Sequence, residues 1–353
     1  MDLAAAVANL RDLLAGRAVA DLRRMPREPV RTRLPTGTLY RYRAPDGVPA
    51  VGGPVLLVPP LGPPDFAYDL RRGCSVVEHL LRTGRPVYLV DLGPISFADR
   101  RLGMEHWVDE VVPAAVRGTC ADAGGSDGVH LVGWSLAGVF CLLAVAAAAS
   151  DPGGTPLPVR TVTAVASPVD IAAVPLVAPL RPLAAVAGGQ ALATVYRALG
   201  SLPAPLVRAA FQLTAVDRLV TRPLGLLSRL DDRDGLAQIE AVDHLMRHMH
   251  AYPGRLFGQV YHLMLRDNDL AGGTLTLAGR TIPLAAVAVP VLVVAGRNDV
   301  IAPLAAVQRV TALLTGAPEV RFETAPGGHL GVLTGRRARH STWAHLDGFL
   351  AGR

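Results

Sequence analysis

The sequence predicts an α/β fold in which a mostly parallel sheet carries helices on both faces. Short apolar runs bounded by glycine and proline alternate with segments of helical periodicity, as in successive βαβ units. The 353 residues are enough to bury a large core. Half of them are hydrophobic and only 18% are charged, which excludes a disordered chain.

The expected strands are short and apolar, as is typical of parallel strands that are buried on both faces. An early strand is expected at residues 39–42, followed by buried strands at 54–60 (PVLLVPP), 86–92 (PVYLVDL), 130–134, 159–166, 291–295 and 320–324. Helices are expected at residues 75–83, 107–116 and 136–149. The last of these helices carries no charge, so we expect it to be buried.

The pattern divides the chain into three segments. Residues 1–167 form the first part of an α/β core, with an N-terminal helix, and residues 289–353 form its second part. Between them, residues 168–288 are rich in proline, leucine and alanine, and they contain no strong strand before TLTLAG at 274–279. We expect this segment to be a mostly helical cap inserted between two strands of the sheet.

Charge and cysteine content exclude several classes of function. The net charge of +6 comes from arginine alone, and the arginines are spread along the chain, which argues against nucleic-acid binding. Cys74, Cys120 and Cys141 form no C-x-x-C pair, which argues against a disulfide framework or a structural zinc site. A reducing cytoplasm is the compartment that fits best.

The N-terminal residues do not have the pattern of a secretion signal. Asp2, Arg11 and Asp12 interrupt the apolar residues there, as in an amphipathic helix. No apolar run reaches the roughly 20 residues that cross a bilayer, so no transmembrane segment is expected. The sequence leaves open a homodimer and an association of the cap with a membrane or a carrier protein.

The segment GWSLAG at residues 133–138 carries the expected nucleophile, Ser135. It lies between a buried strand and an apolar helix and is flanked by small residues, as a nucleophile elbow requires. The fifth position of the usual G-x-S-x-G pattern is Ala137 with Gly138 behind it, a departure of one methyl group. An ordinary helix cap is the alternative role of Ser135, and its position favours the nucleophile.

A nucleophilic serine needs a base and a group that orients the base, and in α/β-hydrolases the chain order is serine, acid, histidine. Asp299 lies in the loop after one predicted strand, and His329 lies in a glycine-rich loop after the last strand. A turn aspartate and a surface histidine are the alternatives, and the order of the three residues favours a triad. Asp91 also ends a strand but precedes Ser135, so we expect it to support a loop.

Acyl transfer also needs backbone N–H donors for the oxyanion. Leu136, directly after the nucleophile, is expected to supply one. Leu61 in PPLGP (59–63) is expected to supply the second, because the flanking prolines have no N–H and stiffen the loop. Simple turn formation is the alternative role of these prolines.

We expect neither a metal ion nor a cofactor. His244 and His248 have the i, i+4 spacing of one helix face, and Asp243 and His250 lie beside them. No cysteine or glutamate completes a recognisable set of metal ligands there.

With these residues in place, the chain resembles the polyhydroxyalkanoate (polyester) synthase-like branch of the α/β-hydrolase superfamily. The resemblance runs from about residue 54 to the end, through VLLVPPLGPPDFAYDL, SVVEHLLRTGRPVYLVDL, the elbow, VLVVAGRNDVIAP and GGHLGVLTG. In that family the elbow nucleophile is a cysteine, the acid lies in an Asp-x-Ile-x-Pro-like segment, and the histidine lies in Gly-His-x-x-Gly. The resemblance implies that these three positions correspond to Ser135, Asp299 and His329 here. Serine therefore stands where the family carries cysteine, which argues against polymer synthesis and leaves acyl transfer or hydrolysis.

The sequence thus predicts a serine-nucleophile acyl hydrolase or acyltransferase that acts on an ester or thioester through an acyl-serine. The resemblance implies an acyl-CoA or carrier-bound donor, with hydroxyacyl groups among the candidates. A polyester synthase or depolymerase-like enzyme, a cofactor-free oxidative enzyme and a non-catalytic ligand-binding homologue remain as alternatives. The acyl chain, the acceptor and the oligomeric state stay open.

Overall fold

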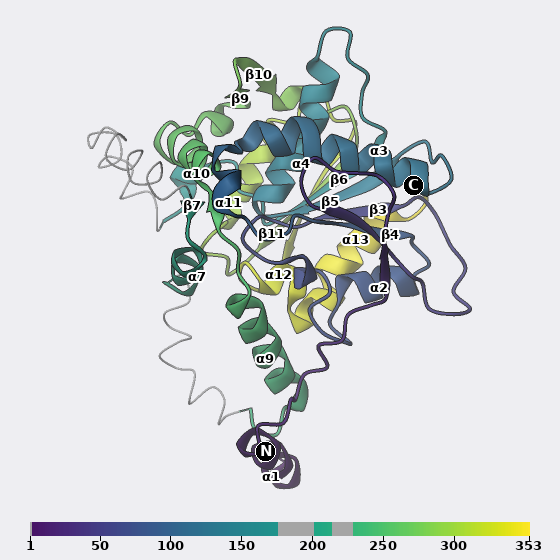
Figure 1. Cartoon of the computed structure of the whole chain (residues 1–353), viewed down its shortest axis with the longest axis vertical. Coiled ribbons are helices and arrows are strands. Elements are labelled where there is room, and N and C mark those ends of the chain that lie inside the picture. The colour runs from purple at the N-terminus through teal and green to yellow at the C-terminus, as the bar shows by residue number, and fades with distance from the viewer. Residues whose placement is uncertain (1, 176–200, 214–228) are drawn as a thin grey trace.

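The computed structural model describes residues 2–175, 201–213 and 229–353. Their main feature is an eight-stranded sheet in the order β1-β2-β4-β3-β5-β6-β11-β12. Helices α3 (Val112–Asp122) and α4 (Leu136–Ser150) cover one face, and α2 (Val76–Arg82), α12 (Gly331–Thr334) and α13 (Thr342–Leu350) cover the other (Figure 1). The predicted α/β architecture with helices on both faces is confirmed.

Six neighbouring strands of the sheet are parallel, and two at one edge are antiparallel. The parallel strands are β4 (Val87–Asp91), β3 (Val55–Val58), β5 (Val129–Trp134), β6 (Val159–Val165), β11 (Val291–Gly296) and β12 (Val320–Ala325). The edge strands are β1 (Arg27–Pro29) and β2 (Thr38–Tyr42). All residues of β3, β5 and β11 are buried, as their apolar runs predict.

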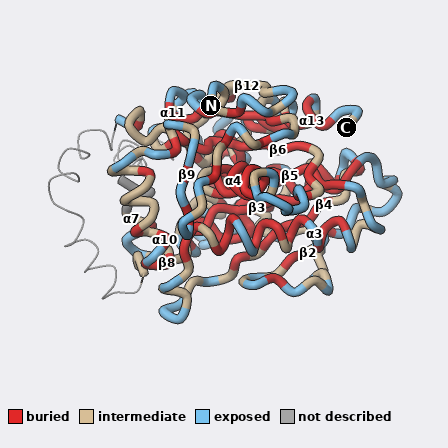
Figure 2. Tube along the Cα trace, turned by 90° about the horizontal axis from the view of Figure 1, so that it is seen from above, coloured by how far each residue is buried: buried red, intermediate tan, exposed pale blue. Residues whose placement is uncertain are grey.

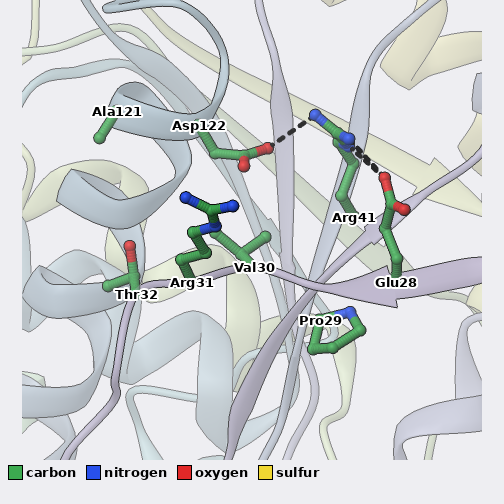
Figure 3. A pocket seen from close by; sticks show the side chains of 8 residues that line it. All are labelled: Glu28, Pro29, Val30, Arg31, Thr32, Arg41, Ala121 and Asp122. Atoms are coloured by element: carbon green, nitrogen blue, oxygen red, sulfur yellow. Dashed lines mark hydrogen bonds and ion pairs between the residues drawn. The ribbon is translucent and has the colours of Figure 1, made fainter.

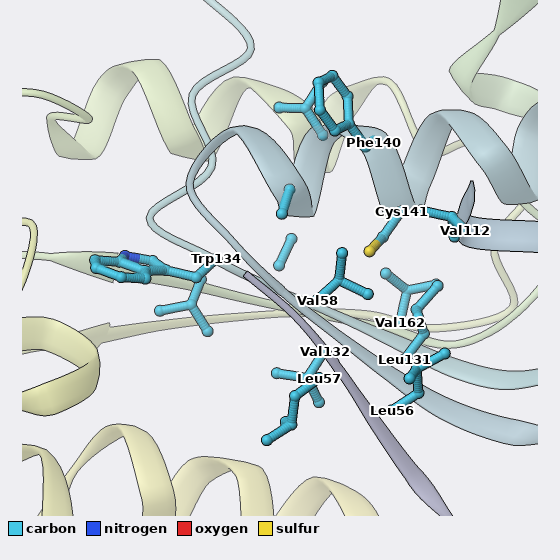
Figure 4. Close-up of a cluster of buried hydrophobic side chains, with 14 of the residues drawn as sticks. Leu56, Leu57, Val58, Val112, Leu131, Val132, Trp134, Phe140, Cys141 and Val162 are labelled. Carbon is cyan, nitrogen blue, oxygen red and sulfur yellow. The ribbon is translucent and has the colours of Figure 1, made fainter. Parts of the chain in front are cut away.

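The core fills both faces of the sheet, and α4 packs on one of them. Every residue of α4 from 137 to 147 is buried, because this uncharged helix packs on β5 and β6 (Figure 2). Cys141 of α4 lies among side chains of the central strands (Figure 4). Burial raises the pKa of its thiol, so Cys141 stays protonated and acts as a small apolar residue.

The segment expected to be a helix at residues 107–116 is helical, but its first part does not have the hydrogen bonds of a regular α-helix. The structure has a π-helical turn at His106–Val111 that continues directly into α3. Pro113 lies in the first turn of α3 and has no backbone N–H to give to an i−4 carbonyl. The wider π turn lets the chain enter α3 without a break.

The described part of the segment between β6 and β11 is mostly helical. It contains a short 3₁₀ turn (Ile171–Ala173), α7 (Ala204–Leu213), α9 (Arg233–Arg247), α10 (Gly254–Gln259), a π-helical turn (Val260–Arg266) and a 3₁₀ turn (Asp269–Gly272). Two antiparallel pairs of strands accompany them: β7 (Ser201–Leu202) with β8 (Tyr252–Pro253), and β9 (Thr274–Leu277) with β10 (Arg280–Pro283). A 3₁₀ turn (Leu284–Ala286) follows β10. The assignment of residues 168–288 as a cap domain stays a prediction, and its residues 176–200 and 214–228 lie outside the described residues.

The N-terminal segment forms α1 (Leu3–Leu14), which lies beside the start of α9 at one end of the molecule (Figure 1). Asn9 donates to the carbonyl of Leu230 at 2.7 Å, and Asp12 pairs with Arg233 at 2.9 Å. Across the described ranges, no helix combines the length and the apolar character needed to cross a membrane.

Candidate active site

Ser135 lies on a sharp turn between β5 and α4. Its backbone has φ 57° and ψ −130°, a conformation that a non-glycine residue rarely adopts. The turn brings Gly133 and Gly138 together: a Cβ on Gly133 would lie 2.6 Å from the Gly138 Cα, and a Cβ on Gly138 would overlap the Ser167 Oγ. The close approach therefore falls on Gly133 and Gly138, and Ala137 is compatible with the turn.

The structure brings Ser135, His329 and Asp299 into one chain of hydrogen bonds. His329 Nε2 lies 2.9 Å from the Ser135 Oγ, and His329 Nδ1 lies 2.8 Å from the Asp299 Oδ2. With the ring neutral, Nδ1–H donates to the carboxylate and Nε2 accepts from the serine hydroxyl. This is the order of contacts that a serine nucleophile, its base and the orienting acid need.

The Asp299 carboxylate is fixed by its own loop. Its side chain is fully buried, and its Oδ1 accepts from the backbone N–H groups of Ile301 at 2.9 Å and Ala302 at 2.8 Å. These bonds leave Oδ2 directed at His329. The Asp299 side chain therefore presents Oδ2 as the acceptor that orients the imidazole.

The acid loop and the histidine loop touch each other because they follow the neighbouring parallel strands β11 and β12. The N–H of Asn298 donates to the carbonyl of Gly327 at 3.1 Å. A Cβ on Gly296 would lie 2.8 Å from that same carbonyl oxygen, so the contact needs glycine at 296. Gly327 has φ +125°, a backbone conformation that also favours glycine.

The two expected oxyanion donors lie on loops that follow adjacent strands. Leu136 begins α4 directly after Ser135, and Leu61 is buried in the loop after β3, which pairs with β5. Residues 59–64 include four prolines, so Leu61 and Gly62 carry the only N–H groups of this loop. Which donors receive an oxyanion stays a prediction.

The backbone of Gly62 is held by the segment that precedes α10. Its carbonyl accepts from the N–H of His250 at 2.7 Å, and its backbone hydrogen-bonds the Tyr252 hydroxyl. Burial raises the pKa of Tyr252 to about 12 although this bond lowers it, so the phenol stays neutral. Because the Gly62 backbone is engaged in this way, Leu61 stays the predicted oxyanion donor of this loop.

The other candidates take no part in the triad. Asp91 accepts from the N–H of Gly93 at 2.9 Å and so supports its own loop, as expected from its place before Ser135. His244 and His248 pack on each other with ring centroids 4.3 Å apart, and both pack on Phe66. Among the described residues, no three potential ligands form a metal-binding group.

A surface pocket of about 500 Å³ lies at the opposite edge of the sheet from the acid and histidine loops, beside β1. Glu28, Arg31, Arg41 and Asp122 are among the residues that line it (Figure 3). Arg41 pairs there with Glu28 and, at 3.1 Å, with Asp122. Because none of the triad residues lines this pocket, it is not the candidate active site.

Sequence reasoning missed two contacts at the site. The indole N–H of Trp134 donates to the backbone carbonyl of His329 at 3.2 Å, and Tyr252 contacts Gly62. Trp134 occupies the variable position of the elbow motif, and Tyr252 is far from Gly62 in the chain. Neither position follows from a local pattern.

The curated proteins that are similar to this chain in sequence share one description. No family model matches the chain. The chain is 26% identical over 303 residues to the poly(3-hydroxyalkanoate) polymerase subunit PhaC of Allochromatium vinosum, covering 85% of this chain and 81% of that protein. It is 25% identical over 303 residues to PhaC of Thiocystis violacea, with the same coverage.

Two solved structures share the fold. The monoacylglycerol lipase of Paleococcus ferrophilus is 17% identical with a TM-score of 0.51, covering 88% of this chain and 98% of that one. BpoC of Mycobacterium tuberculosis is also 17% identical with a TM-score of 0.51, covering 92% and 98%. The chain therefore has the α/β-hydrolase fold, and in sequence it is similar to the PhaC poly(3-hydroxyalkanoate) polymerase subunits.

Proposed function

We propose that this chain is an enzyme that transfers or hydrolyses acyl groups through an acyl-serine at Ser135. The observation that carries the proposal is the continuous hydrogen-bond chain from Ser135 through His329 to the buried Asp299. A ligand-binding homologue without catalysis has no need of this chain of contacts. The relatives' names, which describe poly(3-hydroxyalkanoate) polymerase subunits, support a hydroxyacyl group as the group transferred, and we propose a thioester as its donor.

The reaction follows from the geometry. Ser135 Oγ attacks the acyl carbonyl while His329 Nε2 takes its proton, and the ionised Asp299 stabilises the imidazolium that forms. The N–H groups of Leu136 and Leu61 are the proposed donors to the oxyanion. Collapse of the tetrahedral intermediate expels the thiolate, to which His329 returns the proton, and leaves an oxyester on Ser135. Water or an alcohol, deprotonated by His329, then attacks this ester and releases the acyl group.

The serine nucleophile favours release over chain growth. An acyl-cysteine is a thioester, close in free energy to the acyl-CoA donor, so repeated exchange between enzyme and donor is nearly balanced. An acyl-serine is an oxyester, and its formation from a thioester is downhill. We therefore propose that each acyl group leaves Ser135 once, as a free acid or as a single ester.

The test is the mass of the products after prolonged incubation with a 3-hydroxyacyl-CoA. The proposal expects free hydroxy acid or one ester product, and no product with Ser135→Ala. The matched variant Ser135→Cys is expected to form an acyl-enzyme, since a thiol is already partly ionised near neutral pH, and to release it in a different ratio of products. A ladder of oligomers spaced by one hydroxyacyl unit from the unchanged chain would overturn the proposal in favour of polymer synthesis.

A further inference from the structure

Trp134 joins the strand that carries the nucleophile to the loop that carries the base. It is the last residue of β5, directly before Ser135, and its side chain is fully buried. Its Nε1–H donates to the backbone carbonyl of His329 at 3.2 Å, and its indole ring packs beside the imidazole in a tilted arrangement, with centroids 5.7 Å apart and 33° between the planes. The same side chain therefore contacts both the backbone and the ring of the proposed base.

The Asn298 N–H ties the histidine loop to the acid loop, and Trp134 ties it to β5. His329 follows Gly327 and Gly328, and glycine leaves the backbone more conformational freedom than any other residue. The Asp299 carboxylate fixes only the far nitrogen of the ring. The distance from Nε2 to the Ser135 Oγ also depends on where the loop backbone lies relative to β5, and Trp134 is the side chain that fixes this relation from the nucleophile's own strand.

We propose that Trp134 is a positioning residue that holds His329 in register with Ser135. The inference rests on the proposed function, because it assigns to His329 the role of the base. Without the indole N–H, the His329 carbonyl loses a buried donor and the loop can shift away from the strand. A shift of about 1 Å at a reacting group can lower a rate on the order of a hundredfold, while substrate contacts elsewhere stay intact.

The chain offers a matched control in Trp343. This residue is also buried, and its Nε1–H donates to the carbonyl of Leu333 at 2.8 Å, four residues beyond His329. Trp343→Phe removes the same kind of hydrogen bond without touching the triad. Both substitutions are expected to lower the thermal midpoint, and only Trp134→Phe is expected to change catalysis.

The first measurement is kcat and KM on a short activated ester. Trp134→Phe is expected to lower kcat roughly ten- to a hundredfold with KM changed by less than about threefold, since the lost contact acts on the transition state. Trp343→Phe should keep kcat within about twofold of the unchanged chain. Equal kcat values in the two variants would overturn the proposal.

A second measurement does not depend on turnover. The proton between His329 Nδ1 and Asp299 is expected to give a low-field NMR signal, and this signal should shift or broaden in Trp134→Phe and not in Trp343→Phe. If the unchanged chain has no esterase activity, the proposed function fails, while this signal still tests the positioning role. An unchanged signal in Trp134→Phe would contradict it.

A sulfur isostere covers the case in which Trp134→Phe does not fold. Replacing tryptophan during expression by thianaphthenylalanine substitutes sulfur for the indole N–H with little change in shape. In the described structure Trp107 Nε1 has no hydrogen-bond partner, so the replacement removes no bond there. In the Trp343→Phe chain, the isostere therefore removes only the hydrogen bond of Trp134. We expect the same fall in kcat relative to Trp343→Phe with ordinary tryptophan, and an unchanged kcat would overturn the proposal.

Discussion

The backbone is strained at Ser135, the proposed nucleophile. A non-glycine residue at φ 57° and ψ −130° costs on the order of 1–3 kcal/mol, and the contact between Gly133 and Gly138 holds it there. Ala137 lies at the position where the usual motif has glycine, yet the contact in this structure is made one residue later. Gly133 and Gly138 are therefore the positions that require glycine, and Ala137 is not.

This predicts opposite outcomes for substitutions at neighbouring positions. Gly138→Ala places a methyl group on the Ser167 Oγ and 3.1 Å from the Gly133 carbonyl oxygen, so we expect a loss of about 1–3 kcal/mol of stability and most of the esterase activity. Ala137→Gly should keep the activity and cost no more than about 1 kcal/mol as a helix substitution. Urea unfolding and an ester assay of both variants measure this. A Gly138→Ala protein as stable and as active as the unchanged chain would show that another contact shapes the elbow.

At the scale of elements, the segment that contains β8 and α10 forms hydrogen bonds with the loops that follow β3 and β4. His250 and Tyr252 hold Gly62, and the N–H of Leu256 donates to the carbonyl of Leu102 at 3.1 Å. Gln259 accepts from the N–H of Met104 at 2.6 Å. This part of the inserted segment thus supports the loop that carries the proposed oxyanion donor Leu61.

We expect Tyr252→Phe to weaken the oxyanion site through Gly62. The variant loses the hydroxyl that bonds the Gly62 backbone, so the Leu61 N–H is held less firmly. We expect kcat to fall several-fold, which is less than the roughly 10²–10³-fold loss caused by removing a whole oxyanion donor. The fall should be smaller for a thionoester, because sulfur accepts hydrogen bonds poorly. Tyr88→Phe is the control, since the Tyr88 hydroxyl bonds Asp122 at 2.9 Å, away from the triad. Equal losses on ester and thionoester would argue that Tyr252 only stabilises the fold.

The main strands and the loops that bring Ser135, Asp299 and His329 together were predictable because their signals are local. Buried parallel strands appear as short apolar runs, and Ser135, Asp299 and His329 each lie in a recognisable loop, in the order that the fold requires. The contacts of Trp134 with His329 and of Tyr252 with Gly62 join residues almost 200 positions apart, so no local sequence pattern predicts them. The π turn before α3 also escaped prediction, because helical periodicity does not distinguish it from an α-helical turn.

For the whole molecule, a buried histidine links stability to pH. His130 of β5 is fully buried, and its Nδ1 lies 3.0 Å from the Thr161 hydroxyl. Burial, with Arg85 and Arg160 nearby, lowers its pKa from 6.5 to about 4. The folded state therefore excludes a proton that the unfolded chain binds.

Stability should consequently fall as the pH is lowered from about 6.5 to about 4. In this range the unfolded chain binds a proton at His130 and the folded chain does not, so unfolding becomes more favourable with acid, and the effect levels off below the folded pKa of about 4. His130→Gln is expected to flatten this part of the profile, and the exposed His340→Gln is not. Thermal midpoints between pH 4 and 8 test this, and an equal slope in His130→Gln would assign the acid sensitivity to other groups.

We propose that Ser135 is the nucleophile and that His329 and Asp299 activate it. The most direct measurement is the mass of the peptide labelled by a fluorophosphonate, together with the labelling rate of the triad variants. We expect the label on Ser135, no labelling of Ser135→Ala, nearly complete loss in His329→Ala and a somewhat smaller loss in Asp299→Asn, because triad members act as a unit. A label on another residue, or labelling that survives Ser135→Ala, would contradict the account.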